Sequence, residues 1–160
     1  MAREQDASLL LDFIKGLAAY EKRPQDVTAT VQAVREAVFQ RKRAEAFFIV
    51  ENGNEIGYGI YYYIFSSFAA ACGLYVEDLF IVPEKRGRGY GRAALGWLAE
   101  KALKEGCGGM EWSCLDWNTP AMGFYEKLGA RLKKGSVRFL MEKESMEALA
   151  GSGNGGPSVI

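Results

Sequence analysis

Runs of apolar and polar residues bounded by turn residues predict the strands of this chain. Aromatic and β-branched residues fill these runs, and Asn52-Gly53-Asn54 separates the first two as a hairpin turn. A later run alternates Met110, Trp112 and Cys114 with other residues. The predicted strands are Phe47–Glu51, Ile56–Phe65, Leu74–Val82, Met110–Leu115 and Ser136–Lys143.

Apolar residues that recur every three or four positions predict four helices. Asp6 or Ser8 is the expected cap of the first helix, and Gly106 ends the third. Thr119 is the expected cap of the fourth, with Pro120 at its first position. The predicted helices are Leu9–Tyr20, Thr30–Arg41, the segment between Gly91 and Gly106, and Pro120–Leu128.

The order of these elements is two helices, a strand pair, two strand–helix units and a last strand. Hairpin strands followed by strand–helix units predict an α/β (α+β) fold, with a mixed sheet flanked by helices. The length of 160 residues fits one domain, which we place at residues 1–145. Four glycines and a proline after residue 150 predict a flexible tail, which we place at residues 146–160.

Composition narrows the partners and the chemistry. The formal net charge is zero and no basic stripe is visible, so we expect neither a nucleic acid nor a membrane as partner. A signal peptide pattern and a run long enough to span a bilayer are both lacking, so we expect a cytoplasmic protein. The chain has no histidine, and its three cysteines lack metal-binding spacing. We therefore expect no metal site and no histidine base.

A strand, a glycine-rich loop and a helix follow one another between Glu77 and Leu95. Gly87, Gly89 and Gly91 stand two residues apart among arginines. Glycines let a loop backbone approach a ligand, and the first turn of a helix offers free N–H groups and a partial positive charge. The unit predicts a phosphate or pyrophosphate site; the alternative is a turn whose glycines serve backbone geometry alone. The spacing fits neither a Walker A loop nor the dinucleotide fingerprint.

Two motifs in this order resemble the signatures of a known enzyme superfamily. They are Arg86-Gly-x-Gly-x-Gly91 and Asn118-x-x-Ala121-x-x-Phe124-Tyr125-x-x-x-Gly129-Ala130. Together they resemble the GNAT superfamily of N-acetyltransferases, over roughly Tyr20 to Lys143. Further segments resemble the spermidine/spermine (diamine) N-acetyltransferase branch: Tyr20-Glu21, Tyr61-Tyr62, Tyr75-Val-Glu77-Asp78-Leu79-Phe80 and Asp116-Trp117-Asn118-x-Pro120.

The resemblance implies a twisted mixed sheet that is splayed around acetyl-CoA, and a homodimer. It implies that Tyr20 and Glu21 complete the site near the partner chain, and that Tyr20, Glu21, Glu77 and Asp78 bind the substrate. The cofactor-binding residues it implies are Leu79, Phe80, Ile81, Arg86, Gly87, Arg88, Gly89, Tyr90, Gly91, Arg92, Asn118, Pro120, Ala121 and Tyr125.

Acetyl transfer to an amine assigns roles to these residues. Tyr125 is the expected acid for the departing thiolate, and Glu77 is the expected base, acting through a water molecule. An N–H such as that of Phe80 or Ile81 is the expected oxyanion donor. The alternatives are a merely packed Tyr125 and a Glu77 in a surface ion pair. Cys114 has no histidine to activate it, so we expect direct transfer and no acyl-cysteine.

Two departures from the diamine branch change the expected substrate. Residues 1–6 are too short and polar for the family's first strand, so that strand is missing or clipped here. The segment Arg131–Gly135 is basic where the polyamine enzymes carry an acid, which favours a short diamine or a lysine-like amino acid over spermine. A protein acetyltransferase and a catalytically silent CoA sensor remain the alternative functions.

Overall fold

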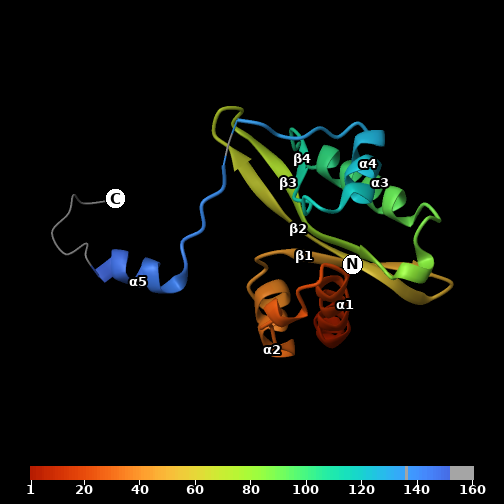
Figure 1. Ribbon diagram of the computed structural model, residues 1–160, viewed down its shortest axis with the longest axis horizontal. Coiled ribbons are helices and arrows are strands. Elements are labelled where there is room, and N and C mark those ends of the chain that lie inside the picture. The colour runs from red at the N-terminus through yellow and green to blue at the C-terminus, as the bar shows by residue number, and fades with distance from the viewer. Residues whose placement is uncertain (136, 152–160) are drawn as a thin grey trace. The chain divides into compact units, whose positions relative to one another are not determined.

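The computed structural model describes residues 1–135 and 137–151. The chain forms two compact units, Met1–Leu115 and Asp116–Ile160. The first unit contains the sheet and helices on both of its faces (Figure 1). None of the helices in the described part of the chain has the length and hydropathy needed to cross a bilayer.

Four strands form the sheet of the first unit. They are β1 (Glu45–Glu51), β2 (Asn54–Ser66), β3 (Ala71–Ile81) and β4 (Met110–Trp112), in the spatial order β1-β2-β3-β4. The first three run antiparallel to their neighbours, whereas β4 pairs parallel to β3. The predicted mixed sheet is confirmed. Strand β4 ends earlier than predicted, because only three of its residues find partners on β3.

Helices α1 (Ala7–Tyr20) and α2 (Val31–Val34) cover one face of the sheet (Figure 1). Leu10 and Phe13 of α1 are buried against Tyr58, Ile60 and Phe80 of the strands. The ring centroids of Phe13 and Tyr58 lie 5.9 Å apart. This packing follows the three-and-four spacing of apolar residues in α1.

Helix α3 (Tyr90–Lys104) covers the opposite face (Figure 1). Its Trp97 packs on Phe47 of β1, with ring centroids 4.8 Å apart, and on Tyr61 of β2 at 6.3 Å. Phe47 crosses directly over Gly59, where an added Cβ would lie 2.4 Å from the ring. A side chain at this position of β2 would therefore displace the aromatic layer beneath α3.

The second half of the predicted second helix is a π-helix, Arg35–Gln40. In this wider turn the N–H of Arg41 donates a hydrogen bond to the carbonyl of Glu36, five residues earlier, at 2.8 Å. No strand precedes α1 in the described residues. Instead Ala2 donates one main-chain hydrogen bond to Ala46 of β1, at 2.9 Å. Ahead of α1, the described residues thus make one main-chain contact with the sheet.

The second unit contains α4 (Thr119–Lys127) and α5 (Lys143–Gly151). Two predictions for this unit are wrong. The cap of α4 is Asn118 and not Thr119, because the Asn118 side chain accepts from the N–H of Ala121 at 3.4 Å. Residues 137–142 form no strand, and α5 starts where the strand was expected to end. Ser136 and most of the expected tail, residues 152–160, lie outside the described residues.

Candidate active site

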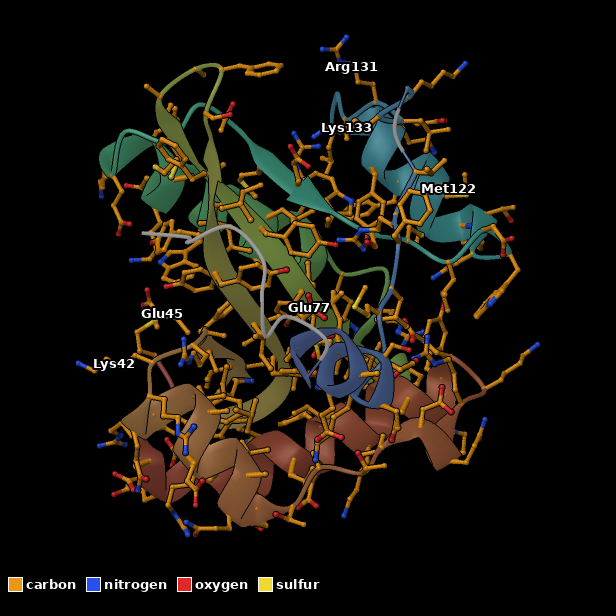
Figure 2. All side chains as sticks on the ribbon, turned by 90° about the vertical axis from the view of Figure 1, so that its left-hand side faces the viewer. Lys42, Glu45, Glu77, Met122, Arg131 and Lys133 are labelled. Atoms are coloured by element: carbon orange, nitrogen blue, oxygen red, sulfur yellow. The ribbon has the colours of Figure 1, made fainter. Side chains whose placement is uncertain are left out.

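A β-bulge interrupts the pairing of β2 and β3 at Glu77. Ile60 pairs with Asp78 and the next residue, Tyr61, pairs with Val76, so Glu77 has no partner on β2. Such a bulge bends a strand and re-aims the side chains next to it. Tyr61 faces α3, so its partner Val76 lies on that side, while Asp78 lies on the side of α1. Glu77 itself is exposed, and Figure 2 labels it on β3.

Asp78 is largely buried beneath α1 and belongs to a group of acids. The hydroxyl of Tyr58 donates to Asp78 Oδ2 at 2.8 Å. Burial raises the pKa of Asp78 to about 6, the Tyr58 hydrogen bond opposes this shift, and the charges of Glu77 and Glu21 add to it. Burial also raises the pKa of Tyr58, so its hydroxyl stays protonated and remains the donor. Three acids, from α1's C-terminus and β3, thus act on one another here.

Tyr20 and Glu21 reach β3 within a single chain. The guanidinium of Arg86 lies 4.0 Å from the centroid of the Tyr20 ring and 5.4 Å from that of Phe80. Its Nε donates to the carbonyl of Ile81 at 2.9 Å. The structure therefore directs the Arg86 side chain toward the end of β3 and the C-terminus of α1, whereas the sequence motif predicts a pyrophosphate contact for it.

The second half of β3 has one edge without a neighbouring strand among the described residues. β4 pairs with β3 only opposite residues 74–76. Val82 donates to a β2 carbonyl at 3.0 Å, and main-chain groups alternate in direction along a strand. Phe80 therefore directs its N–H toward β2, and Leu79 and Ile81 direct theirs to the open edge. Of the two N–H groups predicted as oxyanion donors, only that of Ile81 faces this edge.

The glycine loop leads from the 3₁₀ turn Pro83–Lys85 into α3. Gly89 caps α3 with a φ of 87° and offers no side chain to the helix N-terminus. The first N–H groups of a helix lack partners within the helix, so those from Tyr90 to Arg92 remain available to an anion. An added Cβ at Gly87 or Gly89 would meet nothing within 4 Å. The loop therefore presents open backbone beside two exposed arginines, Arg88 and Arg92.

The remaining predicted site residues belong to the second unit and are described there. Asn118 and Pro120 form the first turn of α4, and Ala121 supplies the capped N–H. Tyr125 lies in the last turn, with its ring centroid 5.4 Å from that of Phe124. Its carbonyl accepts from Leu128 and Ala130, at 3.0 and 3.1 Å. This turn fixes the backbone of Tyr125.

Two residues of the first unit, Tyr58 and Glu51, make polar contacts that the sequence did not predict. Tyr58, which holds Asp78, stands among several tyrosines whose spacing indicates only strand packing. Glu51, at the end of β1, contacts Lys85, Arg88 and Tyr90 around the glycine loop. A glutamate beside a hairpin turn reads as an ordinary surface residue, so no local pattern indicates either contact.

This chain is similar in sequence to known proteins. The model of the acetyltransferase (GNAT) family matches residues 14–130. The thialysine N-epsilon-acetyltransferase of Sus scrofa is 34% identical over 162 residues, which cover 94% of this chain and 95% of the relative. The L-ornithine N5-acetyltransferase of Arabidopsis thaliana is 38% identical over 78 residues, covering 49% of this chain and 34% of that protein.

A solved structure supports the architecture. An integron cassette protein from the mobile metagenome of V. cholerae superimposes with a TM-score of 0.76. The match covers 94% of this chain and 95% of the other, at 24% sequence identity. At that identity the likeness concerns the fold alone.

Proposed function

Because the chain belongs to the acetyltransferase (GNAT) family, we propose that it transfers the acetyl group of acetyl-CoA directly to a primary amine of a short diamine or a lysine-like amino acid. The observation that carries the acceptor is the acidic group at the β3 bulge, Glu21, Glu77 and Asp78. Relatives named for acetylating thialysine and L-ornithine support an amine of this size.

We assign the binding of the acetyl donor, acetyl-CoA, to the glycine loop and the open edge of β3. Acetyl-CoA, when bound, supplies the acetyl group as a thioester. The free N–H groups at the start of α3 hold its pyrophosphate, with Arg88 and Arg92 adding positive charge. The N–H groups of Leu79 and Ile81 face the open edge and are the donors available to the rest of the molecule.

The acidic group receives the acceptor as a cation. Asp78, with a pKa near 6, is mostly ionised at neutral pH and attracts the ammonium together with Glu21. An amine with a pKa near 10 must lose a proton before it attacks. Glu77 is exposed at the bulge, so it takes up this proton through a water molecule.

Transfer forms a nitrogen–carbon bond and breaks the carbon–sulfur bond. The N–H of Ile81 or Leu79 stabilises the negative charge that develops on the carbonyl oxygen. Tyr125 donates its phenol proton to the departing sulfur and regains one from solvent. The support for this role is the position of Tyr125 within the second signature motif.

The proposal includes a homodimer in the cytoplasm. Residues 137–142 expose apolar side chains: Val137 is 78% exposed, Phe139 94% and Leu140 83%. Exposed apolar side chains at this density indicate an interaction surface, and a second copy is the occupant that we propose. Three free cysteines fit a reducing compartment. Sedimentation at assay concentration tests the dimer, and a fully active monomer would contradict it.

The function is tested by turnover with acetyl-CoA and a panel of amines. We expect kcat/KM to be higher for thialysine and a short diamine than for spermine. Spermine clearly ahead would contradict the acceptor assignment, and acetylation of peptides alone would indicate a protein acetyltransferase. Acetyl-CoA binding without turnover of any amine would indicate a CoA sensor.

Two variants test the assigned roles. Tyr125→Phe should lower kcat by roughly 10²-fold and leave acetyl-CoA binding intact, because it removes only an acid. Gly89→Val should abolish most acetyl-CoA affinity in calorimetry, because a β-branched residue is strained at a φ of 87°. An unchanged kcat in Tyr125→Phe would contradict the role of Tyr125 as the acid. An unchanged affinity in Gly89→Val would contradict the role of the glycine loop in binding acetyl-CoA.

A further inference from the structure

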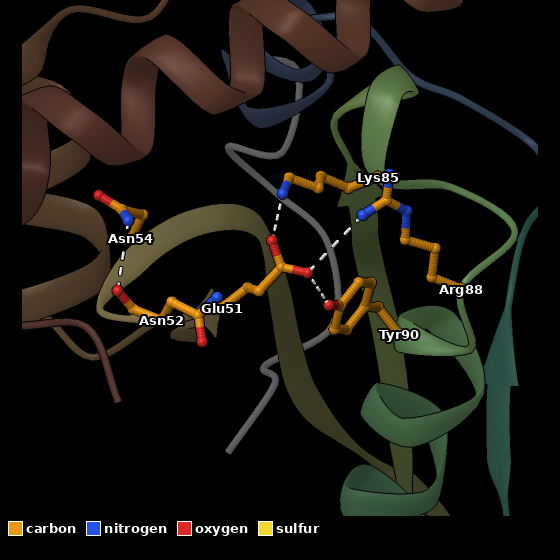
Figure 3. Close-up of polar contacts among 6 residues, drawn as sticks. All are labelled: Glu51, Asn52, Asn54, Lys85, Arg88 and Tyr90. Atoms are coloured by element: carbon orange, nitrogen blue, oxygen red, sulfur yellow. Dashed lines mark hydrogen bonds and ion pairs between the residues drawn. The ribbon is translucent and has the colours of Figure 1, made fainter.

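One carboxylate contacts the glycine loop at three points. Glu51 closes β1, and its two oxygens contact the ammonium of Lys85 and the hydroxyl of Tyr90 (Figure 3). Arg88 Nη1 lies 4.0 Å from Glu51 Oε1. Lys85 precedes the glycines, Arg88 stands among them, and Tyr90 is the first residue of α3. Glu51 therefore connects the β1–β2 hairpin to both ends of the loop.

These contacts differ in closeness and exposure. The side chains of Lys85 and Glu51 are 29% and 20% exposed, whereas that of Arg88 is 56% exposed. The Lys85 hydrogen bond, followed by that of Tyr90, holds the pKa of Glu51 below its usual value, so the carboxylate stays charged at neutral pH. Lys85 and Tyr90 are thus engaged, while Arg88 makes a longer contact with Glu51 and is more exposed.

The charge of Glu51 is unexpected beside a site for a phosphate. A carboxylate repels an anionic ligand, so a purely electrostatic view predicts that Glu51 weakens binding. A positional view predicts the reverse. The loop has two glycines at positive φ and no cap side chain at Gly89, so its own residues do little to fix its shape.

We propose that Glu51 is a positioning residue for acetyl-CoA binding. By holding Lys85 and Tyr90 it fixes both ends of the glycine loop, so that the N–H groups of the first turn of α3 converge on one anion. It leaves Arg88 free to turn toward that anion. This inference rests on the proposed pyrophosphate site.

Tyr90→Phe separates the two views, because it removes a hydroxyl and leaves every charge in place. We expect KM and Kd for acetyl-CoA to rise roughly ten-fold, since hydrogen bonds to charged groups are among the stronger ones. The kcat at saturating acetyl-CoA should stay unchanged. Glu51→Gln should also weaken binding, and less than Glu51→Ala, because the amide oxygen still accepts from Tyr90.

The matched control is Tyr63→Phe. It removes a tyrosine hydroxyl that also hydrogen bonds a glutamate, Glu105, at the opposite end of α3. Acetyl-CoA affinity should equal that of the unmodified protein. Wild-type affinity in Tyr90→Phe, or tighter binding by Glu51→Gln, would overturn the proposal.

A second readout needs no ligand. Amide hydrogen exchange of residues 86–92 should be faster in Tyr90→Phe and Glu51→Ala than in Tyr63→Phe, after any difference in thermal stability is taken into account. If the unmodified protein did not bind acetyl-CoA, the proposed function would fail while this readout still decided whether Glu51 orders the loop. Equal exchange in all variants would refute the positional role.

Discussion

Two carboxylates of the same sheet, Asp78 and Glu51, have opposite surroundings although each accepts the hydroxyl of a tyrosine. Asp78 is largely buried among other acids, and its pKa is raised to about 6. Glu51 is bound by Lys85, and its pKa is lowered. The tyrosine hydrogen bond lowers the pKa in both places, so burial and charged neighbours decide the difference.

The two carboxylates differ in the charges around them. The charged neighbours of Asp78 are the acids Glu77 and Glu21, and under the proposed function the cationic amine balances their charge. Glu51 already has its cations and organises a loop for an anion. The two proposed sites, for a positive and a negative ligand, thus lie on one sheet.

Among the acids at the β3 bulge, we expect the largest loss of activity from a substitution at Glu77. We expect Glu77→Gln to lower kcat by roughly 10²-fold and to raise the KM for the amine, because the proton acceptor is lost. The pH–rate profile should move to higher pH, since the reaction then waits for free amine. Steady-state kinetics between pH 6 and 10 measure this. An unchanged profile would show that solvent takes the proton.

Asp78→Asn should lower the activity of the protein and raise its stability. We expect kcat/KM for cationic amines to fall about ten-fold, the scale of one buried hydrogen bond to a charge. The protein should nevertheless become more stable at pH 7.5.

The sign of that change follows from the pKa. In the fold the pKa of Asp78 rises from 3.8 to about 6, so its contribution to stability is full below pH 3.8 and is lost as the pH rises through 6. Asparagine has no such loss, and the gain above pH 6 is at most about 3 kcal/mol at 1.36 kcal/mol per pKa unit. Urea unfolding at pH 4 and 7.5 checks this. A less stable variant at pH 7.5 would show that the charge is favourable in the fold.

Tyr58→Phe removes the hydrogen bond that opposes the raised pKa of Asp78. We expect the pKa of Asp78 to rise further, so that kcat/KM falls a few-fold at pH 6 and recovers at pH 8. Loss of a buried hydrogen bond should cost about 1 kcal/mol of unfolding free energy. Equal losses at both pH values would mean that Tyr58 serves packing alone.

We expect the smallest effect from removing the charge of Glu51, which is surrounded by cations. Because its neighbours lower the pKa of Glu51, its ionised form stabilises the fold above pH 4.5, and this contribution is lost as the pH falls. Glu51→Gln should therefore slightly lower Tm at pH 7. The Glu51 ion pairs remain partly accessible to solvent, so salt screens them and the difference should shrink in 1 M salt, unlike the gain in Asp78→Asn. Thermal scans at low and high salt measure both.

Local sequence patterns predicted most elements of the fold, because helix and strand periodicity depend on neighbouring residues. Residues 137–142 show the limit. Their alternation indicates a strand, but a strand forms only by pairing with another strand, and residues 137–142 pair with no strand among the described residues. The following Lys143–Gly151 is rich in Glu, Met, Ala and Leu, and helix propensity prevails there.

Motifs in the sequence nominated the candidate site residues, whereas contacts between residues far apart in the sequence could not be predicted. Glu77 and Asp78 stand together in the sequence, and their neighbouring charges could be read there. Tyr58 and Asp78 are twenty positions apart, and only the β2–β3 register brings them together. Likewise the Arg86 motif indicates an anion, whereas the end of α1 decides that its guanidinium stacks on Tyr20.

The three-residue contact between β3 and β4 has a consequence for how the chain acquires its structure. Residues 45–81 pair as consecutive antiparallel strands, so this meander can close while later residues are still being synthesised. The parallel pairing of β4 requires α3 to be complete first. We therefore expect the meander to gain amide protection early in refolding and β4 to join last, which pulse-labelled hydrogen exchange would detect. The pairing of β4 with Leu74–Val76, next to the open half of β3 that faces the proposed donor, is then the last part of the sheet to form.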